Sequence, residues 1–516
     1  MKLPDSRASH WLLTVASGAL SVLCFAPFRQ FWLMPLLLAL LFSLALAQPR
    51  ARQAAGLGAL WGLSAYTANF YWIYISLHDV GGMPAWLALP MTLLLPAYLC
   101  LYPALALGLA HRLGAERAWW TLPALWILSE WLRATVMTGF PWGNIGYSQI
   151  PEGPLAGWAP VGGVYLVAAW VALSAAALAH SARHGLRRAA PALALGVLVW
   201  LAGMGLKTVS WTEDAGELDV ALLQGNIAQE MKWRPETFAH TLQTYQQLLD
   251  QYPARVVILP ETAIPLFADQ VPPGVLAWLA DSARAQGSEL VTGMPYLHPQ
   301  NPDRYYNAAL ALTSPQPVYG KDHLVPFGEF VPLPWLTGWV YRYLNMPLAG
   351  FSSGGAVQAP MQLAGHRLAF NICYEDSFGD ELRAGARQAE ALVNLSNLAW
   401  FGHSTAADQH LQLSQTRALE TGRPMLRATN TGATAVVRAD GSVQARLADF
   451  TTGGLRARVE TRRGNTPYLR GGDLPTLLAS LMVLLAAFWT RRHCQTHLDS
   501  DKNLHDFRHS GHKGAP

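Results

Sequence analysis

The first 206 residues are dominated by long apolar segments, each near the length that crosses a bilayer. A hydrocarbon core about 30 Å thick needs roughly 20 apolar residues in a helix. Seven segments before the polar part of the chain and one after it approach this length: Trp11 to Phe28, Phe31 to Ala47, Ala54 to Leu77, Ala85 to Leu109, Trp119 to Leu132, Val161 to Leu178, Pro191 to Leu206 and Leu474 to Thr490. The sequence therefore predicts a multi-pass α-helical membrane domain with eight transmembrane helices.

Charge divides the chain into a membrane part and a polar part. Hydrophobic residues make up 51% of the sequence and charged residues 14%, which is typical of an integral membrane protein. Between His10 and Leu206 the only acidic residues are Asp79, Glu116, Glu130 and Glu152. We predict a seven-span domain over 1–207, a polar domain over 208–473, an eighth span over 474–490 and a basic tail over 491–516. The net charge of +4 is small for this length, so we expect no nucleic-acid partner.

The basic residues of the short loops predict the orientation. Loops after the second, fourth and sixth spans carry seven arginines, whereas those after the first, third and fifth carry only Arg29 and Arg133; the seven are Arg50, Arg52, Arg112, Arg117, Arg183, Arg187 and Arg188. Loops rich in Lys and Arg stay in the cytoplasm. The N-terminus and the tail are therefore predicted to be cytoplasmic, and the polar domain extracytoplasmic.

Short β-rich runs alternate with helical patterns in the polar domain. Helices are predicted over Pro235 to Gln251, Val275 to Ala285, Glu381 to Gln388 and Ala406 to Leu419. Strands are predicted in "LDVALLQGNI", "ARVVILPE", "SELVTGMPY", "HRLAFNICYED", "AEALVNLSN" and "RPMLRATNTGATAVV". This alternation favours an α/β sandwich whose sheets are covered by helices.

Three polar residues stand at or near the ends of these strands. Glu261 ends "VVILPE", Lys321 lies in "VYGKDHLVPFGE", and Cys373 ends "LAFNIC" and is the only cysteine of the predicted extracytoplasmic domain. Taken singly, a surface carboxylate, a solvated lysine and a core cysteine are the simpler interpretations. Together they supply a thiol nucleophile, a base for its proton and a cation for the thiolate and an oxyanion.

Several motifs resemble known families. "LPET", "GKDHLVPFGE" and "NICYED" resemble the Glu, Lys and Cys segments of the nitrilase (carbon-nitrogen hydrolase) superfamily. "EWLRATVMTGFPWGNIGYSQ", "QGNIAQEMKW", "NLSNLAWF" and "RATNTG" narrow the match to the apolipoprotein N-acyltransferase family, and the resemblance covers nearly the whole chain. Ala228 departs from the proline of that family's pattern, with no expected effect on chemistry.

The resemblance implies a nitrilase-like α-β-β-α sandwich and a role for each site residue. Glu261 would be the general base, Lys321 the cation at the oxyanion, and Cys373 the nucleophile. The main-chain N–H of Tyr374 would be a second oxyanion donor. Glu329 and Glu375 would orient Lys321, with Glu329 as a purely structural ion partner the alternative; Asp376 has no assigned role. No metal and no cofactor are implied.

The resemblance also implies the reaction and its place. Cys373 would take the sn-1 acyl chain of a phospholipid, most simply phosphatidylethanolamine, as a thioester and pass it to the α-amino group of a diacylglyceryl apolipoprotein. The enzyme would sit in the bacterial inner membrane with its catalytic domain in the periplasm. Tentative substrate-binding residues are Trp233, Trp335, Trp339, Trp400 and Arg133.

Two features of the chain keep alternative interpretations open. The aromatic stretch from Pro332 to Phe351 is either a packed arm or a lid on the membrane surface that admits acyl chains. Arg133 is either a structural partner of Glu130 or a headgroup contact.

Two other functions remain as alternatives. A membrane-tethered amidase would use the same three residues, but it would not need seven preceding spans. A transporter fits the span count alone, and the spans show no evident inverted repeat.

Overall fold

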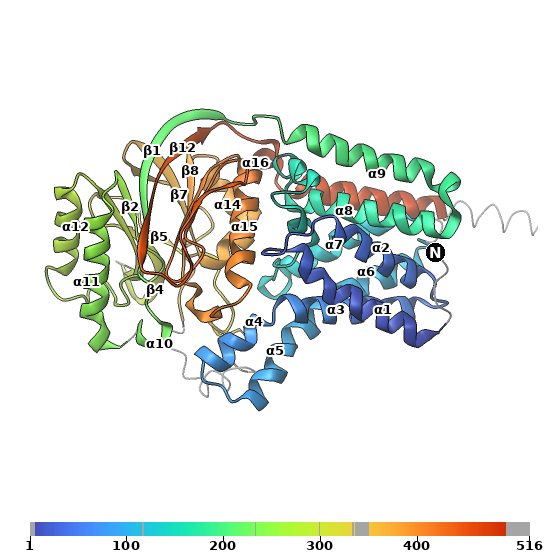
Figure 1. Ribbon diagram of the computed structural model, residues 1–516, viewed down its shortest axis with the longest axis horizontal. Coiled ribbons are helices and arrows are strands. Elements are labelled where there is room, and N and C mark those ends of the chain that lie inside the picture. The colour runs from blue at the N-terminus through green and yellow to red at the C-terminus, as the bar shows by residue number, and fades with distance from the viewer. Residues whose placement is uncertain are drawn as a thin grey trace, which may run out of the picture.

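The computed structural model describes residues 6–115, 118–232, 234–298, 300–332, 335 and 350–491. Apolar helices form one end of the molecule and a two-sheet domain forms the other (Figure 1). The N-terminal helices are α1 (Arg7–Leu20), α2 (Leu33–Leu46), α3 (Ala51–Asn69), α4 (Trp72–Ile75), α5 (Ala85–Leu99), α6 (Leu101–Arg112), α7 (Thr121–Thr135), α8 (Ala159–His184) and α9 (Leu186–Leu206). One further helix, Leu474–Arg491, lies beside α8, where the Thr476 hydroxyl meets the Gly162 carbonyl at 3.4 Å.

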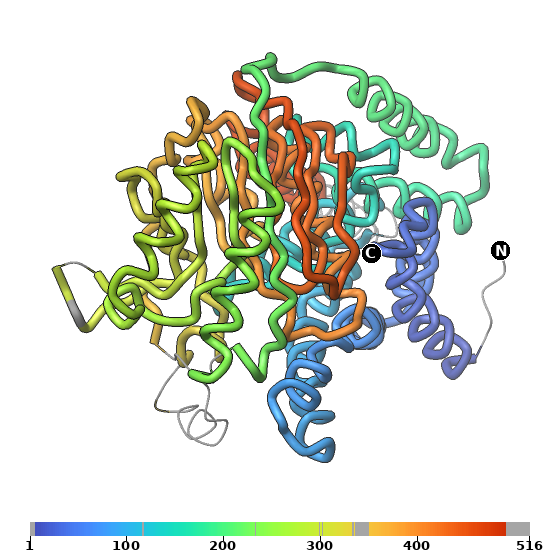
Figure 2. The backbone as a smooth tube through the Cα atoms, turned by 60° about the vertical axis from the view of Figure 1, so that its left-hand side comes forward, coloured from blue at the N-terminus to red at the C-terminus, as the bar shows by residue number. Residues whose placement is uncertain are grey.

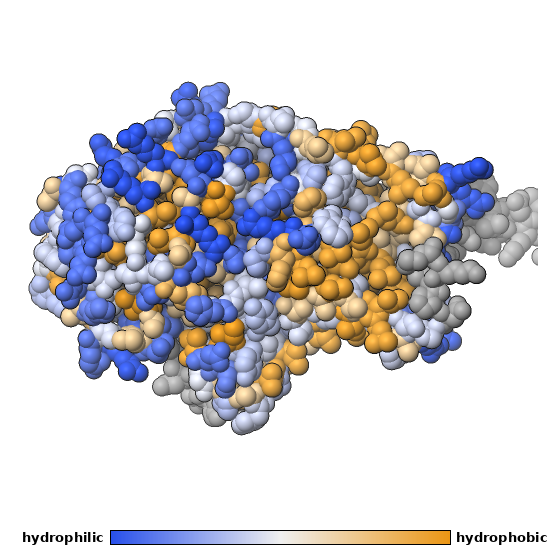
Figure 3. Space-filling model, in the orientation of Figure 1, coloured by the Kyte–Doolittle hydropathy of each residue, from blue (hydrophilic) through white to orange (hydrophobic). Residues whose placement is uncertain are grey.

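Four helices of the described residues are long and apolar enough to cross a membrane: Ala85–Arg112, Pro154–His184, Leu186–Leu206 and Leu474–Arg491. The segments predicted as spans one, two and five fold into shorter helices, with 14 residues in α1, 14 in α2 and 15 in α7. Hydrophobic side chains are concentrated on the helical end and hydrophilic ones on the sheet domain (Figure 3). The protein is therefore a membrane protein, and helix length and composition identify four candidate spans among the described residues.

Two six-stranded sheets build the second domain. The first has the order β12-β1-β2-β3-β4-β5 and the second β11-β10-β9-β8-β7-β6. The first contains β1 (Glu213–Gln224), β2 (Val256–Ile258), β3 (Glu289–His298), β4 (Asn301–Ala311), β5 (Tyr319–Gly320) and β12 (Gly453–Arg463). The second contains β6 (Met361–Leu363), β7 (His366–Ile372), β8 (Ala391–Ser396), β9 (Met425–Thr429), β10 (Ala435–Val437) and β11 (Val443–Arg446).

The sheets pack face to face, and helices cover their outer faces. Alternate side chains of β1, β2, β7, β8 and β9 form the buried core between the sheets. Outside the first sheet lie α10 (Gln229–Lys232), α11 (Pro235–Gln251) and α12 (Val275–Ala285); outside the second lie α14 (Gly379–Ala386) and α15 (Ala406–Thr421). The short α16 (Pro467–Gly471) precedes the last apolar helix. This is the α-β-β-α sandwich predicted from the sequence, seen from two sides in Figures 1 and 2.

Strand β12 is the main element that the sequence pattern did not indicate. Its segment, "GGLRARVETRR", carries five charged residues, because its side chains alternate between solvent and the sheet. It pairs antiparallel with β1 from Glu213 to Gln224 and closes the edge of the first sheet. On its other side β1 pairs with β2 in parallel, and β2 pairs with β3 in parallel. The carboxyl ends of these central strands therefore lie at the same edge of the sheet.

Helix α15 joins the sandwich to the membrane helices and lies between them (Figure 1). The Gln412 amide donates to the Ile150 carbonyl at 2.7 Å and accepts from the Ala26 N–H at 3.0 Å. Near the other end of α15, Glu420 accepts from the Val164 N–H at 2.8 Å. Polar groups of the membrane half are thus paired with one helix of the catalytic half, as buried polar groups must be.

Candidate active site

The ends of three strands bring Glu261, Lys321 and Cys373 together. Glu261 follows β2, Lys321 follows β5, and Cys373 follows β7. Lys321 is 1% exposed and Glu261 8% exposed. The charges of Glu261 and Lys321 both act on the Cys373 thiol. The three residues that the sequence predicted as catalytic therefore lie in one site, with Glu261 and Lys321 buried and Cys373 partly buried.

A hydrogen-bonded chain of carboxylates and amides fixes the base and the cation. Asn307 Nδ2 on β4 donates to Glu261 Oε1 at 2.7 Å and to Glu329 Oε1 at 3.0 Å. Lys321 Nζ contacts both carboxylate oxygens of Glu329, at 2.9 and 2.8 Å. Asn397 N–H donates to Glu261 Oε2 at 2.8 Å. Glu329 is thus the direct ion partner of Lys321.

Burial sets the proton affinities of the three groups. Loss of water raises the pKa of Glu261, although Lys321 opposes the change. Burial also raises the pKa of the Cys373 thiol, and Glu261 adds to the effect. Burial works against the charge of Lys321, but Glu329 and the other acidic groups hold its pKa above its ordinary value. At rest the site contains a neutral thiol beside a carboxylate and a protonated amine.

The backbone at the nucleophile has an unusual conformation. Cys373 has a φ of 55°, in the left-handed region that non-glycine residues rarely adopt. It opens a short 3-10 helix, Cys373–Ser377. The Glu375 carboxylate of this turn accepts from Ile372 N–H at 2.6 Å and from Tyr319 OH at 2.9 Å. A sharp turn after β7 therefore presents the sulfur at the end of the strand.

Glu375 binds the main chain next to Lys321, and among the described residues no hydrogen bond joins it to the Lys321 side chain. Its Oε1 accepts from the main-chain N–H groups of Asp322 and His323, at 2.7 and 3.2 Å. Burial raises the pKa of Glu375 to about 7, against the influence of Lys321. The carboxylate ties the residues that follow Lys321 to the end of β7. The Tyr374 hydroxyl donates to the Gly139 carbonyl of the membrane half at 3.3 Å.

Sequence reasoning missed three residues of this site: Lys232, Asn307 and Asn397. Lys232 is 3% exposed, and its Nζ donates to the Glu261 carbonyl at 3.1 Å. Burial lowers its pKa to about 8. Asn397 directly follows the apolar run "ALVNLS", so a search for polar residues at strand ends indicates it. Asn307 lies inside β4, where no strand end marks it. Lys232 follows no strand, but it lies in the motif "QGNIAQEMKW", which was the available signal for it.

The residues that the sequence suggested for substrate binding do not form one cluster among the described residues. Trp233 and Trp339 lie outside the described residues, as does most of the predicted lid. Trp335 is 81% exposed, and Trp400 is partly buried in the turn Leu398–Phe401, directly after Asn397. The Arg133 side chain is fully buried and bonded to Glu130 and to the carbonyls of Phe140 and Trp142. Its donors are occupied inside the protein, so the structural-pair interpretation describes it and the headgroup contact does not.

Comparisons with known proteins agree with this geometry. Residues 17–177 match the model of the apolipoprotein N-acyltransferase N-terminal domain, and residues 219–466 match that of carbon-nitrogen hydrolase. An apolipoprotein N-acyltransferase of Chromobacterium violaceum is 53% identical over 93% of this chain and 94% of the relative. One of Nitrosomonas europaea is 46% identical over 93% of this chain and 98% of the relative. The chain belongs to the apolipoprotein N-acyltransferase family.

Membership in this family makes the protein an acyltransferase that acts in lipoprotein maturation, with a nitrilase-like catalytic domain. The relatives match the membrane half and the catalytic half together, which does not favour the amidase alternative. Among solved structures, an amidase from Nesterenkonia sp. aligns with a TM-score of 0.36 and 22% identity, over 49% of this chain and 92% of the other.

Proposed function

We propose that this acyltransferase works through a thioester on Cys373, with Glu261 as base and Lys321 as oxyanion cation. The observation that carries the proposal is that Glu261, Lys321 and Cys373 come together at the strand ends. A neutral thiol needs a base within the site, and the Glu261 carboxylate is held in place by Asn307 and Asn397. A protonated Lys321 supplies the charge that a tetrahedral intermediate requires.

The first half-reaction transfers the acyl chain to the enzyme. Glu261 takes the Sγ proton, and the thiolate attacks the sn-1 ester carbonyl of a phospholipid. The new oxyanion is held by Lys321 and by Tyr374 N–H. Collapse of the intermediate breaks the ester C–O bond, and the leaving glycerol oxygen takes the proton from Glu261. The products are a Cys373 thioester and a lysophospholipid.

The second half-reaction returns the enzyme to its resting state. The α-amino group of a diacylglyceryl apolipoprotein attacks the thioester, and Glu261 accepts the amine proton. Collapse breaks the C–S bond and forms the amide, and the Cys373 thiolate regains its proton from Glu261. Two lipid substrates use one nucleophile in turn, which is a ping-pong cycle. Phosphatidylethanolamine is the donor we propose.

The contacts of the helical half support the orientation that we propose, with eight spans in the inner membrane and the catalytic domain in the periplasm. Arg491 donates to the Arg112 carbonyl, so two basic positions predicted to be cytoplasmic lie together. At the opposite end, Arg29 pairs with Glu152, and Lys207 donates to the Pro151 carbonyl at 2.9 Å, next to α15 of the catalytic domain. The outer cations are therefore engaged in contacts within the protein.

The four regions predicted from the sequence complete the proposal. We assign residues 1–207 to a seven-span domain, 208–473 to the catalytic domain, 474–490 to the eighth span and 491–516 to a cytoplasmic basic tail. Helix α9 ends at Leu206, β1 begins at Glu213 and the last apolar helix begins at Leu474, which supports these boundaries.

Mass analysis of the Cys373 peptide tests the proposal. Purified enzyme is incubated with phosphatidylethanolamine in detergent, without reducing agent, and digested. We expect an acyl adduct on the wild-type peptide and none in Cys373→Ala or Glu261→Gln. Addition of a diacylglyceryl lipopeptide should discharge the adduct and yield an N-acylated product. An unmodified Cys373 under turnover conditions would exclude the thioester.

A further inference from the structure

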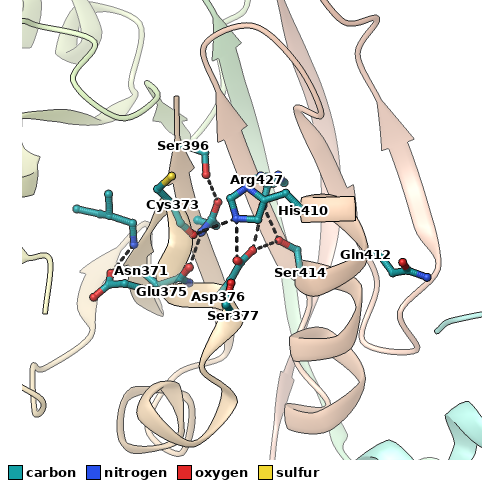
Figure 4. A network of polar contacts seen from close by, with 12 residues as sticks. Asn371, Cys373, Glu375, Asp376, Ser377, Ser396, His410, Gln412, Ser414 and Arg427 are labelled. Atoms are coloured by element: carbon teal, nitrogen blue, oxygen red, sulfur yellow. Dashed lines mark hydrogen bonds and ion pairs between the residues drawn. The ribbon is translucent and has the colours of Figure 1, made fainter. Parts of the chain in front are cut away.

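A buried network of charged and polar groups lies behind the nucleophile, on the side of α15 (Figure 4). Asp376 is 0% exposed and accepts from three side chains. Its Oδ1 meets His410 Nε2 at 2.8 Å, and its Oδ2 accepts from Ser414 Oγ at 2.5 Å and from Arg427 Nη1 at 3.0 Å. The steps proposed above use none of these groups.

The network reaches the nucleophile through its main-chain carbonyl. The Cys373 oxygen accepts from His410 Nε2 at 3.1 Å and from Asn394 Nδ2 at 3.1 Å. Figure 4 shows this carbonyl turned toward His410 and the sulfur turned away from it. The contacts therefore hold the backbone of Cys373 rather than its thiol.

The hydrogen-bond partners of His410 determine where its proton lies. Both partners of Nε2, the Cys373 carbonyl and the Asp376 carboxylate, are acceptors, so Nε2 carries a hydrogen. Nδ1 is buried and has no hydrogen-bond partner among the described residues. A proton on Nδ1 would therefore create a buried N–H without an acceptor, which costs free energy. His410 is thus a neutral imidazole with its proton on Nε2. Burial and the nearby charge of Arg427 lower the pKa of His410, although Asp376 opposes them.

The orientation of one peptide plane follows from these contacts. The peptide between Cys373 and Tyr374 is trans, so its C=O and N–H point in opposite directions. Because His410 and Asn394 hold the Cys373 carbonyl on one side of the peptide, the Tyr374 N–H points to the other side, where the thiol lies. If the plane turned over, the carbonyl would lose two hydrogen bonds and face the reacting ester. The left-handed φ of Cys373 makes such support necessary.

We propose that Asp376, His410 and Arg427 are positioning residues that hold the Cys373–Tyr374 peptide plane with the Tyr374 N–H aimed at the oxyanion. Arg427 Nη1, which also donates to Ser414 Oγ at 2.7 Å, fixes the Asp376 carboxylate. Asp376 fixes the His410 tautomer, and His410 fixes the carbonyl. The inference rests on the proposed function, because it concerns a donor of that mechanism.

Two reactions of Cys373 separate this role from general structural support. Alkylation by iodoacetamide needs the thiolate but forms no oxyanion, whereas acylation by phosphatidylethanolamine forms one. We expect His410→Phe to slow acylation at least tenfold. Its alkylation rate should stay within twofold of the wild-type rate at each pH, and its Tm should stay within a few degrees of the wild-type Tm. His410→Gln, which keeps a donor, should recover much of the acylation rate.

Asp376→Asn provides a second, independent variant. Asparagine presents one donor and one acceptor where the network needs two acceptors, so it must place a donor against either His410 or Arg427. We expect a similar loss of acylation, and no further loss in the double variant with His410→Phe. Thr416→Val, on the same helix but outside the network, serves as the matched control and should acylate normally.

Three results would reject either the positioning role of the network or the proposed function. Acylation by His410→Phe within twofold of wild type overturns the inference, and so does an equal fall in alkylation and acylation, which would mean general damage around Cys373. Failure of the wild-type enzyme to form the acyl adduct would instead reject the proposed function.

Discussion

At the scale of single residues, burial makes ordinary side chains reactive. Glu261 is buried, and the loss of hydration raises the pKa of its carboxyl group above the ordinary glutamate value. The two lysines respond differently. Lys321 contacts Glu329 and keeps its proton. Lys232 Nζ donates to the Glu261 carbonyl instead of pairing with a carboxylate among the described residues, and burial lowers its pKa to about 8. The site therefore contains a base, Glu261, with a raised pKa and an amine, Lys232, with a pKa lowered to about 8.

The acidic limb of the pH profile should report Glu261. Because a base acts in its deprotonated form, acylation should rise with pH through an inflection above the ordinary glutamate value. Asn307→Ala removes a hydrogen bond that favours the carboxylate, so its inflection should move further up and its rate at neutral pH should fall several-fold. Single-turnover acylation from pH 4 to 9 measures this; Asn301→Ala, on the exposed end of β4, is the control. An unshifted inflection would mean that Glu261 is not the base.

The alkaline limb should report Lys232. Above pH about 8 this lysine loses its charge, and with it the attraction that it offers to the thiolate and the oxyanion. Lys232→Met should lower the acylation rate roughly tenfold near pH 7 and abolish the alkaline decline that the wild type shows. Lys207→Met, at the membrane end of the chain, should leave both limbs unchanged. An alkaline limb that persists in Lys232→Met would assign it to another group.

At the scale of elements, the sequence predicted the sandwich well because its helices and buried strands have strong periodicity. The helices Pro235–Gln251 and Val275–Ala285 begin and end where the pattern predicted. Catalytic residues at strand ends were equally visible. Strand β12 was missed, since alternate arginines on an edge strand resemble a solvated loop. Asn307 and Lys232 were missed because their importance comes from contacts with Glu261, far away in sequence.

Helix α7 shows how a buried ion pair inside the membrane half fixes a loop. Arg133 binds Glu130 one turn before it and the carbonyls of Phe140 and Trp142 after it. Arg133→Met would leave Glu130 buried without its partner, at a cost of about 3–5 kcal/mol in unfolding free energy. Thermal unfolding in detergent should show this loss, and the Glu130→Met, Arg133→Met double variant should recover part of it.

The same pair of variants separates the two interpretations of Arg133. If the arginine is structural, the recovered double variant should bind phosphatidylethanolamine with a KM close to that of wild type. A KM raised tenfold in a stably folded double variant would restore the headgroup interpretation, because the contact with the lipid phosphate would be lost without a loss of folding.

At the scale of the whole molecule, an apolar helical half and a polar catalytic half share a large interface. The acyl donor is a lipid, so a site that receives its chain must lie within reach of the bilayer. Helix α15 provides that connection: one face carries His410 toward Cys373, and another carries Gln412 toward the Ala26 and Ile150 loops. The position of the nucleophile is thereby tied to the membrane helices, and the orientation of those helices decides which lipid leaflet supplies the substrate.

Cysteine labelling tests that orientation directly. Leu186, the first residue of α9, is 72% exposed at the end of the molecule predicted to be cytoplasmic, whereas Asp269 is exposed on the catalytic domain. In spheroplasts a membrane-impermeant maleimide should label Asp269→Cys and not Leu186→Cys, and both should react after permeabilisation, with the wild-type chain giving the background of native cysteines. Labelling of Leu186→Cys in intact spheroplasts would invert the arrangement. The catalytic domain would then face the cytoplasm, and the acyl chain would come from the inner leaflet.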